Sequence, residues 1–435
     1  MTDGFLARLA RRTSIEALQA EEHRTGLRRV LGGRDLIAIG LGTMIGGGIF
    51  TTIGPGVAKA GPAIIIAFLL AGLASFFAAL CYAELGSMVP VAGSAYTYAY
   101  ATLGQLVAWI IGWDLILEYA VSAAPVAAAF SSSVQGAAKS IWHVALPAWA
   151  QTANWVHVGP WWAFWSFDPS KTTVDAIGAL FILALSALLV IGIKETATTN
   201  NAFVVVKISA LVVFVIVGLS LFHPANLVPF APYGWGAIGF GASGNGIVPA
   251  AALVFFTYIG FDTATTTAEE TRNPKRDVPI GVLGSLAIGT VIYCTVALVL
   301  VGVVPWQQVD QNAALLAALA PLHSPWLDAI ITIGVIAGTT SVALTSLLGQ
   351  SRIFYVMARD RMLPPAVAAV HPRFKTPARM TIITGFVVAL LTFVIPLDAL
   401  LELVNIGTFS AFIIVCAGVI WLRYKRPDLP RPFRS

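Results

Sequence analysis

Long apolar stretches separated by short polar ones make up nearly the whole of this sequence. Ten of them hold about 20 mostly apolar residues or more, the length that a helix needs to cross a hydrocarbon core of about 30 Å. The ten segments are approximately 36–57, 62–86, 102–134, 174–193, 201–222, 246–268, 279–304, 326–356, 378–396 and 400–422. The pattern predicts an all-α, polytopic membrane protein with one integral domain.

The composition agrees with this pattern. Hydrophobic residues make up 57% of the 435 positions and charged residues only 11%, whereas about 25% of an ordinary soluble domain is charged. So few charges cannot cover a water-exposed surface. The three cysteines, Cys81, Cys294 and Cys416, fall in three different spans without paired spacing, so neither a disulfide framework nor a metal cluster is indicated.

Lysine and arginine positions predict which side of the membrane each loop faces, because these residues prefer short cytoplasmic loops. With the N-terminus inside, 22 of the 26 fall on the cytoplasmic side, only Lys59, Lys139 and Lys171 fall outside, and the remaining one, Lys207, lies within span 5. We therefore expect residues 1–34 to form a cytoplasmic arm, without a removable signal peptide, and residues 424–435 to form a cytoplasmic tail. The net charge of +5 reflects this topology and anionic lipid, without a nucleic-acid partner.

Span 1 contains three consecutive glycines, Gly46, Gly47 and Gly48. Each costs about 1 kcal/mol relative to alanine inside a helix, so something must offset this cost. One interpretation is close packing of small residues between helices. The other is an unwound point whose freed backbone N–H groups face a ligand carboxylate, and glycine permits that close approach. Three successive glycines exceed what packing is expected to require.

Span 6 is also irregular, because Phe255 to Asp262 is followed by the threonine-rich stretch Thr263 to Thr267 and by Glu269 and Glu270. Its aromatic residues could belong to an ordinary core. Its position favours another interpretation, because span 6 comes five spans after span 1 and opens a second half of opposite orientation. Inverted repeats with discontinuous helices in corresponding places indicate a binding site at the membrane midplane.

Among the ionisable residues inside spans, three are singled out as functional candidates, because charge at bilayer depth is costly and a functional role is the default hypothesis. Lys207 lies deep in span 5 without an acidic neighbour, and desolvation would favour its neutral form, so it either loads and releases a proton or pairs permanently with carbonyls of span 1. Glu118, in span 3, either pairs with protein donors or serves as counter-ion for a cationic substrate. Asp262 either caps the second half of span 6 or joins a proton path.

Several stretches together are similar to one family: Gly42 to Phe50, Tyr82 to Tyr96, Phe255 to Asp262 with Ala268 to Gly281, and Gly349 to Tyr355 with Ala358 to Pro364. They resemble the amino acid-polyamine-organocation superfamily and, within it, the cationic amino acid transporter family and its bacterial members. The resemblance implies the leucine-transporter fold, here with inverted repeats at 35–222 and 223–423 and discontinuous helices 1 and 6. Members usually have twelve or more spans, so the family's spans 11 and 12 are absent from this sequence.

The resemblance also implies roles for particular residues. Amides of Ile45, Gly46, Gly47 and Gly48 would meet the substrate carboxylate. Carbonyls of Met44, Phe256, Thr257 and Ile259 would meet its ammonium group. The aromatic gate would be Phe256 or Tyr258, and Glu118 would contact the substrate side chain. Related transporters carry a lysine in span 5 where sodium-coupled relatives bind sodium, so proton coupling would involve Lys207, Gly42, Thr340, Ser341 and Asp262.

The implied function is proton-coupled, sodium-independent symport of cationic and/or small neutral L-amino acids into the cell, with protons as the only coupling ion and no cofactor or metal. An exchanger or an amino acid sensor of the same fold is the alternative. We expect a multi-pass protein of the cell membrane that acts as a monomer among lipids. An enzyme is not indicated, because the six histidines lie in or beside loops without metal-binding spacing and no nucleophile–base set is present. A channel is not indicated either, because it would need rings of charge or a repeated filter motif, and neither is visible in the sequence.

Overall fold

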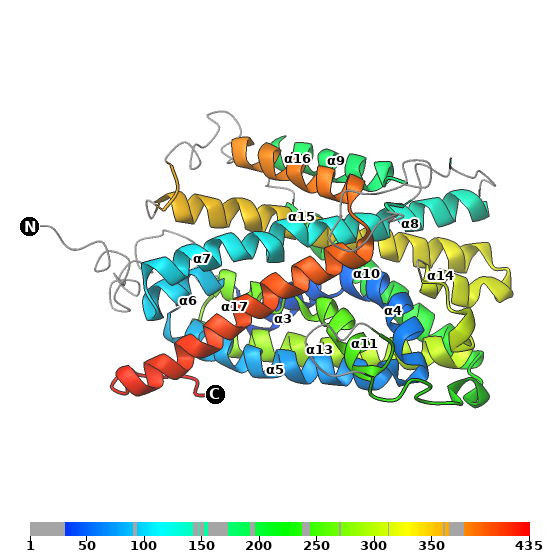
Figure 1. Cartoon of the computed structure of the whole chain (residues 1–435), viewed down its shortest axis with the longest axis horizontal. Coiled ribbons are helices and arrows are strands. Elements are labelled where there is room, and N and C mark those ends of the chain that lie inside the picture. The colour runs from blue at the N-terminus through cyan, green and yellow to red at the C-terminus, as the bar shows by residue number, and fades with distance from the viewer. Residues whose placement is uncertain are drawn as a thin grey trace, which may run out of the picture.

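The computed structural model describes residues 31–89, 94–141, 147, 152–154, 173–191, 196–236, 244–268, 271–311, 313–359, 362–364 and 378–435. Within these ranges the chain is helical, with two isolated bridges and no longer strand (Figure 1). Most of the arm predicted at 1–34, together with Glu269 and Glu270, lies outside the described residues.

All ten predicted spans are helical where they are described. In chain order the helices are α3 (Gly33–Met44) with α4 (Gly47–Ala60); α5 (Ile64–Met88); α7 (Gln105–Leu115), η2 (Ile116–Val121) and α8 (Ala123–Ile141); α9 (Ala176–Ile191); α10 (Thr196–Ser220); α11 (Ile247–Val254), η5 (Phe255–Tyr258) and α12 (Thr263–Thr266); α13 (Pro274–Val303); α15 (Pro325–Arg359); α16 (Ala378–Val394); and α17 (Leu397–Lys425). Shorter helices are η1 (Gly61–Ala63), α6 (Ser94–Thr102), η4 (Pro224–Leu227), η7 (Trp306–Gln308), α14 (Ala314–Leu319) and η8 (Ala320–Leu322).

Length and apolar composition support membrane crossing. Seven helical stretches among the described residues are long and apolar enough to span a bilayer, and two shorter apolar helices, Ala176–Val190 and Ala378–Val394, accompany them. One of the seven, Gly47–Met88, joins the second half of span 1 to span 2, so these nine stretches account for the ten predicted spans. Large apolar side chains such as Leu180, Phe386 and Ile413 are more than half exposed, as expected of surfaces that contact lipid.

Span 3 differs from the prediction of one continuous helix over 102–134. Gly104 has a φ of +107°, which separates α6 from α7, so the span begins at Gln105. Its middle then widens into the π-helical turn η2 before α8 begins. π-helical turns are rare and occur frequently at functional sites.

The helices form two groups around two hydrophobic clusters. One group contains α3, α5 and α13, which pack extensively on one another, and the other contains α8, α9, α15 and α16 (Figure 1). The first cluster takes its side chains mainly from spans 1, 2, 6 and 7, and the second mainly from spans 3, 4, 8, 9 and 10. Phe256 of span 6 belongs to the second cluster, so span 6 lies at the boundary between the groups.

One ion-pair cluster ties α17 to α5 at the end of the molecule where α17 finishes. The Glu84 side chain is 1% exposed, and its carboxylate accepts a hydrogen bond from Arg423 at 2.6 Å. Arg431 lies 3.3 Å from the other oxygen, and the Ser435 backbone N–H donates at 2.9 Å. The buried carboxylate is thus paired, as burial of a charge requires.

We expect Glu84→Ala to lower the unfolding temperature of the detergent-extracted protein. The substitution leaves Arg423 and Arg431 without their partner in a partly buried place, a loss of about 2 kcal/mol. Asp428→Ala is the control, because it removes only the exposed pair with Arg426 and should leave the unfolding temperature unchanged. Equal unfolding temperatures for wild type and Glu84→Ala would contradict the stabilising role.

Candidate functional site

Span 1 is broken at Ile45 and Gly46, which confirms the predicted discontinuity. Helix α3 ends at Met44, Ile45 has an extended backbone (φ −79°, ψ 105°), and α4 begins at Gly47. The first bond of the new helix runs from the Phe50 N–H to the Gly46 carbonyl oxygen at 3.4 Å. The N–H groups in the first turn of α4 have no partner within the helix, so this point favours a negatively charged group.

The three glycines of span 1 also pack against other helices. A Cβ atom at Gly47 would lie 2.1 Å from a methyl carbon of Val126, and one at Gly48 would lie 2.5 Å from the Thr257 Cα atom. Gly46 approaches the backbone of α15 in the same way. The expectation that the glycine run exceeds what packing requires is therefore wrong. The break and the close packing occur together.

Span 6 is broken just after η5, again as predicted. Ile259 is extended (φ −62°, ψ 133°), and Gly260 has a φ of +111°, a conformation that residues with a Cβ rarely adopt. The Thr43 hydroxyl, one residue before the end of α3, donates to the Gly260 carbonyl oxygen at 2.9 Å. The two interruptions therefore face each other and are joined by a hydrogen bond.

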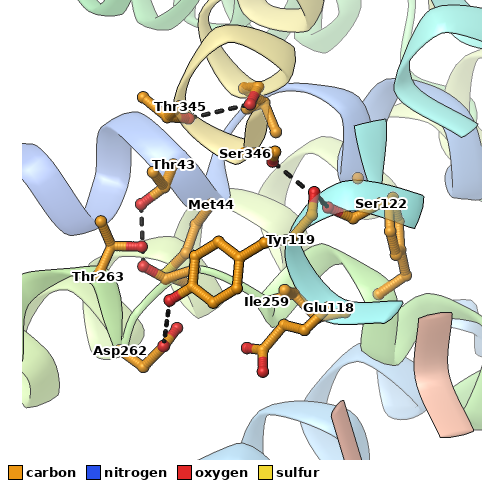
Figure 2. A pocket seen from close by; sticks show the side chains of 14 residues that line it. Thr43, Met44, Glu118, Tyr119, Ser122, Ile259, Asp262, Thr263, Thr345 and Ser346 are labelled. Carbon is orange, nitrogen blue, oxygen red and sulfur yellow. Dashed lines mark hydrogen bonds between the residues drawn. The ribbon is translucent and has the colours of Figure 1, made fainter. Parts of the chain in front are cut away.

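A pocket of about 470 Å³, including its opening, lies beside the two breaks (Figure 2). The residues that line it come from spans 1, 3, 6 and 8: Thr43, Met44, Gly48, Glu118, Tyr119, Ser122, Phe256, Ile259, Gly260, Asp262, Thr263, Val342, Thr345 and Ser346. Six of them were predicted as site residues: Met44, Gly48, Glu118, Phe256, Ile259 and Asp262. Ile45, Gly46, Gly47, Thr257 and Tyr258 are buried and are not part of this lining.

Tyr258 cannot be the gate in this structure, which corrects one of the two gate candidates. Its side chain is fully buried, and its hydroxyl donates to the Phe68 carbonyl oxygen of α5 at 2.8 Å. Its ring packs edge-on against Tyr293 of α13, with centroids 5.4 Å apart. Successive residues of the tight η5 turn point in different directions, so the neighbouring Phe256 lines the pocket and Tyr258 does not.

Glu118 lines the pocket from the π-helical turn η2. It is 2% exposed, and neither carboxylate oxygen has a hydrogen-bond partner among the described residues. A buried acid without donors is costly unless it is neutral or meets a cation. One of the two interpretations was that Glu118 pairs with protein donors, and no such pair is found within the described part of the chain. The other, a counter-ion role toward a cationic substrate, stays a prediction.

Asp262 occupies the position before α12, but its side chain makes no capping hydrogen bond. Its carboxylate instead accepts a hydrogen bond from the Tyr119 hydroxyl at 2.9 Å, and Figure 2 shows the Tyr119 ring reaching across to it. The interpretation of Asp262 as a helix cap is therefore wrong, because the carboxylate turns toward span 3. Its role in proton transfer stays a prediction.

Lys207 lies on another side of span 1. Its side chain is 0% exposed, and its ammonium group donates to the carbonyl oxygen of Gly42 and lies 3.5 Å from the Ser341 hydroxyl. Gly42 carries one of the last carbonyls of α3, which have no partner within the helix. Thr340 is not among the hydrogen-bond partners of Lys207.

Sequence reasoning missed all six residues that bring hydroxyl groups to the pocket. They are Thr43, Tyr119, Ser122, Thr263, Thr345 and Ser346. The Ser122 hydroxyl bonds to that of Ser346 at 3.3 Å, which joins span 3 to span 8. Ser122 follows Glu118 by four residues, and this helical spacing was a usable signal. Nothing in the sequence relates span 8 to span 3.

Comparison with known proteins gives consistent matches along the chain. The family model described as amino acid permease matches residues 31–435. The chain is similar to the branched-chain amino acid permease BcaP of Bacillus subtilis (strain 168), with 41% identity over 98% of this chain and 87% of the relative. It is 38% identical to the methylthioribose transporter of the same organism, over 99% of this chain and 88% of the relative. It is 34% identical to cationic amino acid transporter 4 of Homo sapiens, over 99% of this chain and 65% of the relative.

The contact between Gly48 and Thr257 can be tested by adding one methyl group. We expect Gly48→Ala to reduce solute uptake at least tenfold, because its Cβ would lie 2.5 Å from a backbone atom and force spans 1 and 6 apart. Gly244→Ala is the matched control, since nothing lies within 4 Å of a Cβ there. Uptake into cells with equal amounts of each protein is the measurement. Wild-type uptake by Gly48→Ala would show that the close spacing of spans 1 and 6 at this point is not needed for transport.

Proposed function

This chain belongs to the amino acid permease family, and on that premise we propose that it imports amino acids by sodium-independent symport with protons. It is a multi-pass membrane protein whose helices carry a pocket beside two broken spans. We further propose that the protein lies in the plasma membrane with the arm and the C-terminal tail in the cytoplasm, because lysine and arginine concentrate in the corresponding loops.

The observation that carries the proton-coupling proposal is the position of Lys207. A buried ammonium donates to the Gly42 carbonyl, whereas a neutral amine would hold that carbonyl more weakly. Gly42 immediately precedes Thr43 and Met44, which line the pocket. Protonation of Lys207 and occupation of the pocket therefore act on the same few residues of span 1. Two ligands that bias one structural element are thermodynamically coupled.

The lining of the pocket supports cationic and/or small neutral amino acids as substrates. Two acidic side chains, Glu118 and Asp262, line it, and no lysine, arginine or histidine does so among the described residues. The amides at the start of α4 suit a carboxylate, and the interrupted backbone of span 6 suits an ammonium group. The hydroxyl groups on spans 3 and 8 suit a short or polar side chain better than a large apolar one.

We expect Lys207→Ala to abolish accumulation driven by a pH gradient in sodium-free proteoliposomes. Wild type should concentrate alanine or arginine severalfold, whereas the variant should only equilibrate it, because the protonatable group on span 1 is gone. Exchange of labelled for unlabelled substrate at equal pH should persist and show that the pocket is intact. Lys59→Ala, which removes a lysine at the end of α4, is the control. Accumulation by Lys207→Ala at the wild-type level would refute the coupling role.

Glu118→Gln should reduce the preference for arginine over alanine about tenfold in competition assays. A buried carboxylate contributes about 1.5 to 3 kcal/mol to a hydrogen-bonded cation, and the neutral amide contributes less. Glu402→Gln, on an exposed face of α17, serves as the control and should leave the ratio unchanged. If Glu118→Gln also leaves the ratio unchanged, Glu118 has no part in recognising the side chain.

A further inference from the structure

Two carbonyl groups of the interrupted stretch in span 6 are held by hydroxyl groups from other helices. The Thr257 carbonyl oxygen accepts a hydrogen bond from the Tyr293 hydroxyl at 2.9 Å, and the Gly260 carbonyl oxygen accepts one from Thr43 at 2.9 Å. Between them, Ile259 lines the pocket, and no hydrogen bond to its carbonyl oxygen is found among the described residues. The two held carbonyls thus bracket those of Tyr258 and Ile259, and of these two residues only Ile259 lines the pocket, where its carbonyl is left for a ligand.

Tyr293 bonds to the Thr257 carbonyl from outside the pocket lining. It stands on α13, is 0% exposed and is not part of the pocket lining. Its ring is held between Tyr258, at a centroid distance of 5.4 Å, and Phe68, at 5.9 Å. Both are contacts between rings, so they do not depend on the Tyr258 hydroxyl. The Tyr293 hydroxyl therefore has a fixed position from which to hold the Thr257 carbonyl.

Thr257 is also the point where span 6 touches span 1. A Cβ atom at Gly48 would lie 2.5 Å from the Thr257 Cα atom, so the two backbones are in direct contact there. Gly48 belongs to the first turn of α4, where free N–H groups favour a carboxylate. An α-amino acid carries its carboxylate and its ammonium group on one carbon atom. Any movement of Thr257 would therefore change the spacing between the two halves of the site.

We propose that Tyr293 is a positioning residue for substrate binding: it holds the Thr257 carbonyl away from the pocket so that the Ile259 carbonyl faces the substrate ammonium group. The inference rests on the proposed function, because it presupposes an α-amino acid bound at both charged groups. Tyr293 itself does not touch the substrate. Its contribution is preorganisation, since a carbonyl that is already oriented need not be ordered on binding.

Tyr293→Phe removes only the hydroxyl and so tests the proposal directly. We expect the KM for arginine and for alanine to rise about tenfold while the maximal rate stays within twofold of wild type. Inhibition by 5-guanidinopentanoate and by propanoate, which lack the α-amino group, should not change. The selectivity for the amino acid over its deaminated analogue should therefore fall about tenfold, which general damage to the fold would not produce.

Tyr258→Phe is the matched control, because it removes the hydroxyl of the adjacent ring, whose partner is on α5 and not in the interrupted stretch. Its selectivity should equal that of wild type. An unchanged KM in Tyr293→Phe would overturn the proposal. An equally large weakening of inhibition by the deaminated analogues would overturn it too. Failure of Tyr293→Phe to accumulate as folded protein would also overturn it, because the hydroxyl would then serve folding. If wild type takes up neither amino acid, the proposed function fails first.

Discussion

The backbones of spans 1 and 6 touch where both helices are interrupted, and the pocket depends on this contact. Gly48 lies against Thr257, and the Thr43 hydroxyl bonds to the Gly260 carbonyl. An interrupted helix inside a bilayer leaves N–H and C=O groups that water cannot reach, so protein or ligand must satisfy them. Hydroxyl groups of neighbouring helices satisfy some of these groups. In the proposed function, others are left at the pocket for a ligand with two opposite charges.

The same segment of span 1 is approached from two sides. The pocket is lined by Thr43, Met44 and Gly48, and Lys207 bonds to the Gly42 carbonyl just before them. The pocket also lies between the two helix groups, because Met44 comes from α3 in one group and Ser346 from α15 in the other. A change in the relative position of the groups would therefore change the pocket. In the proposed function this geometry allows a proton and a substrate to bias one motion.

Particular residues show how far sequence reasoning reaches. The glycine run and the irregular span 6 located both breaks, because backbone conformation is encoded locally by glycine and by the loss of helical periodicity. The same reasoning could not choose between Phe256 and Tyr258, which are two residues apart in η5 and differ in the direction of their side chains. One of the two interpretations of Asp262 made it the cap of the second half of span 6, but its carboxylate accepts a hydrogen bond from Tyr119 of span 3. Where a side chain can bond either to a neighbour in sequence or to a residue on another helix, the packing of the helices decides which bond forms.

The sequence by itself determined the all-helical membrane architecture, the ten spans and the places where two of them are interrupted. These follow from hydrophobicity and local conformational preference, which each segment carries on its own. The tertiary structure alone decided which interrupted carbonyls are occupied, through Tyr293 and Thr43, and which hydroxyls of spans 3 and 8 meet in the pocket. These contacts join residues more than 30 and up to about 220 positions apart. Such pairings depend on how the helices pack, and packing is a property of the whole bundle rather than of any one span.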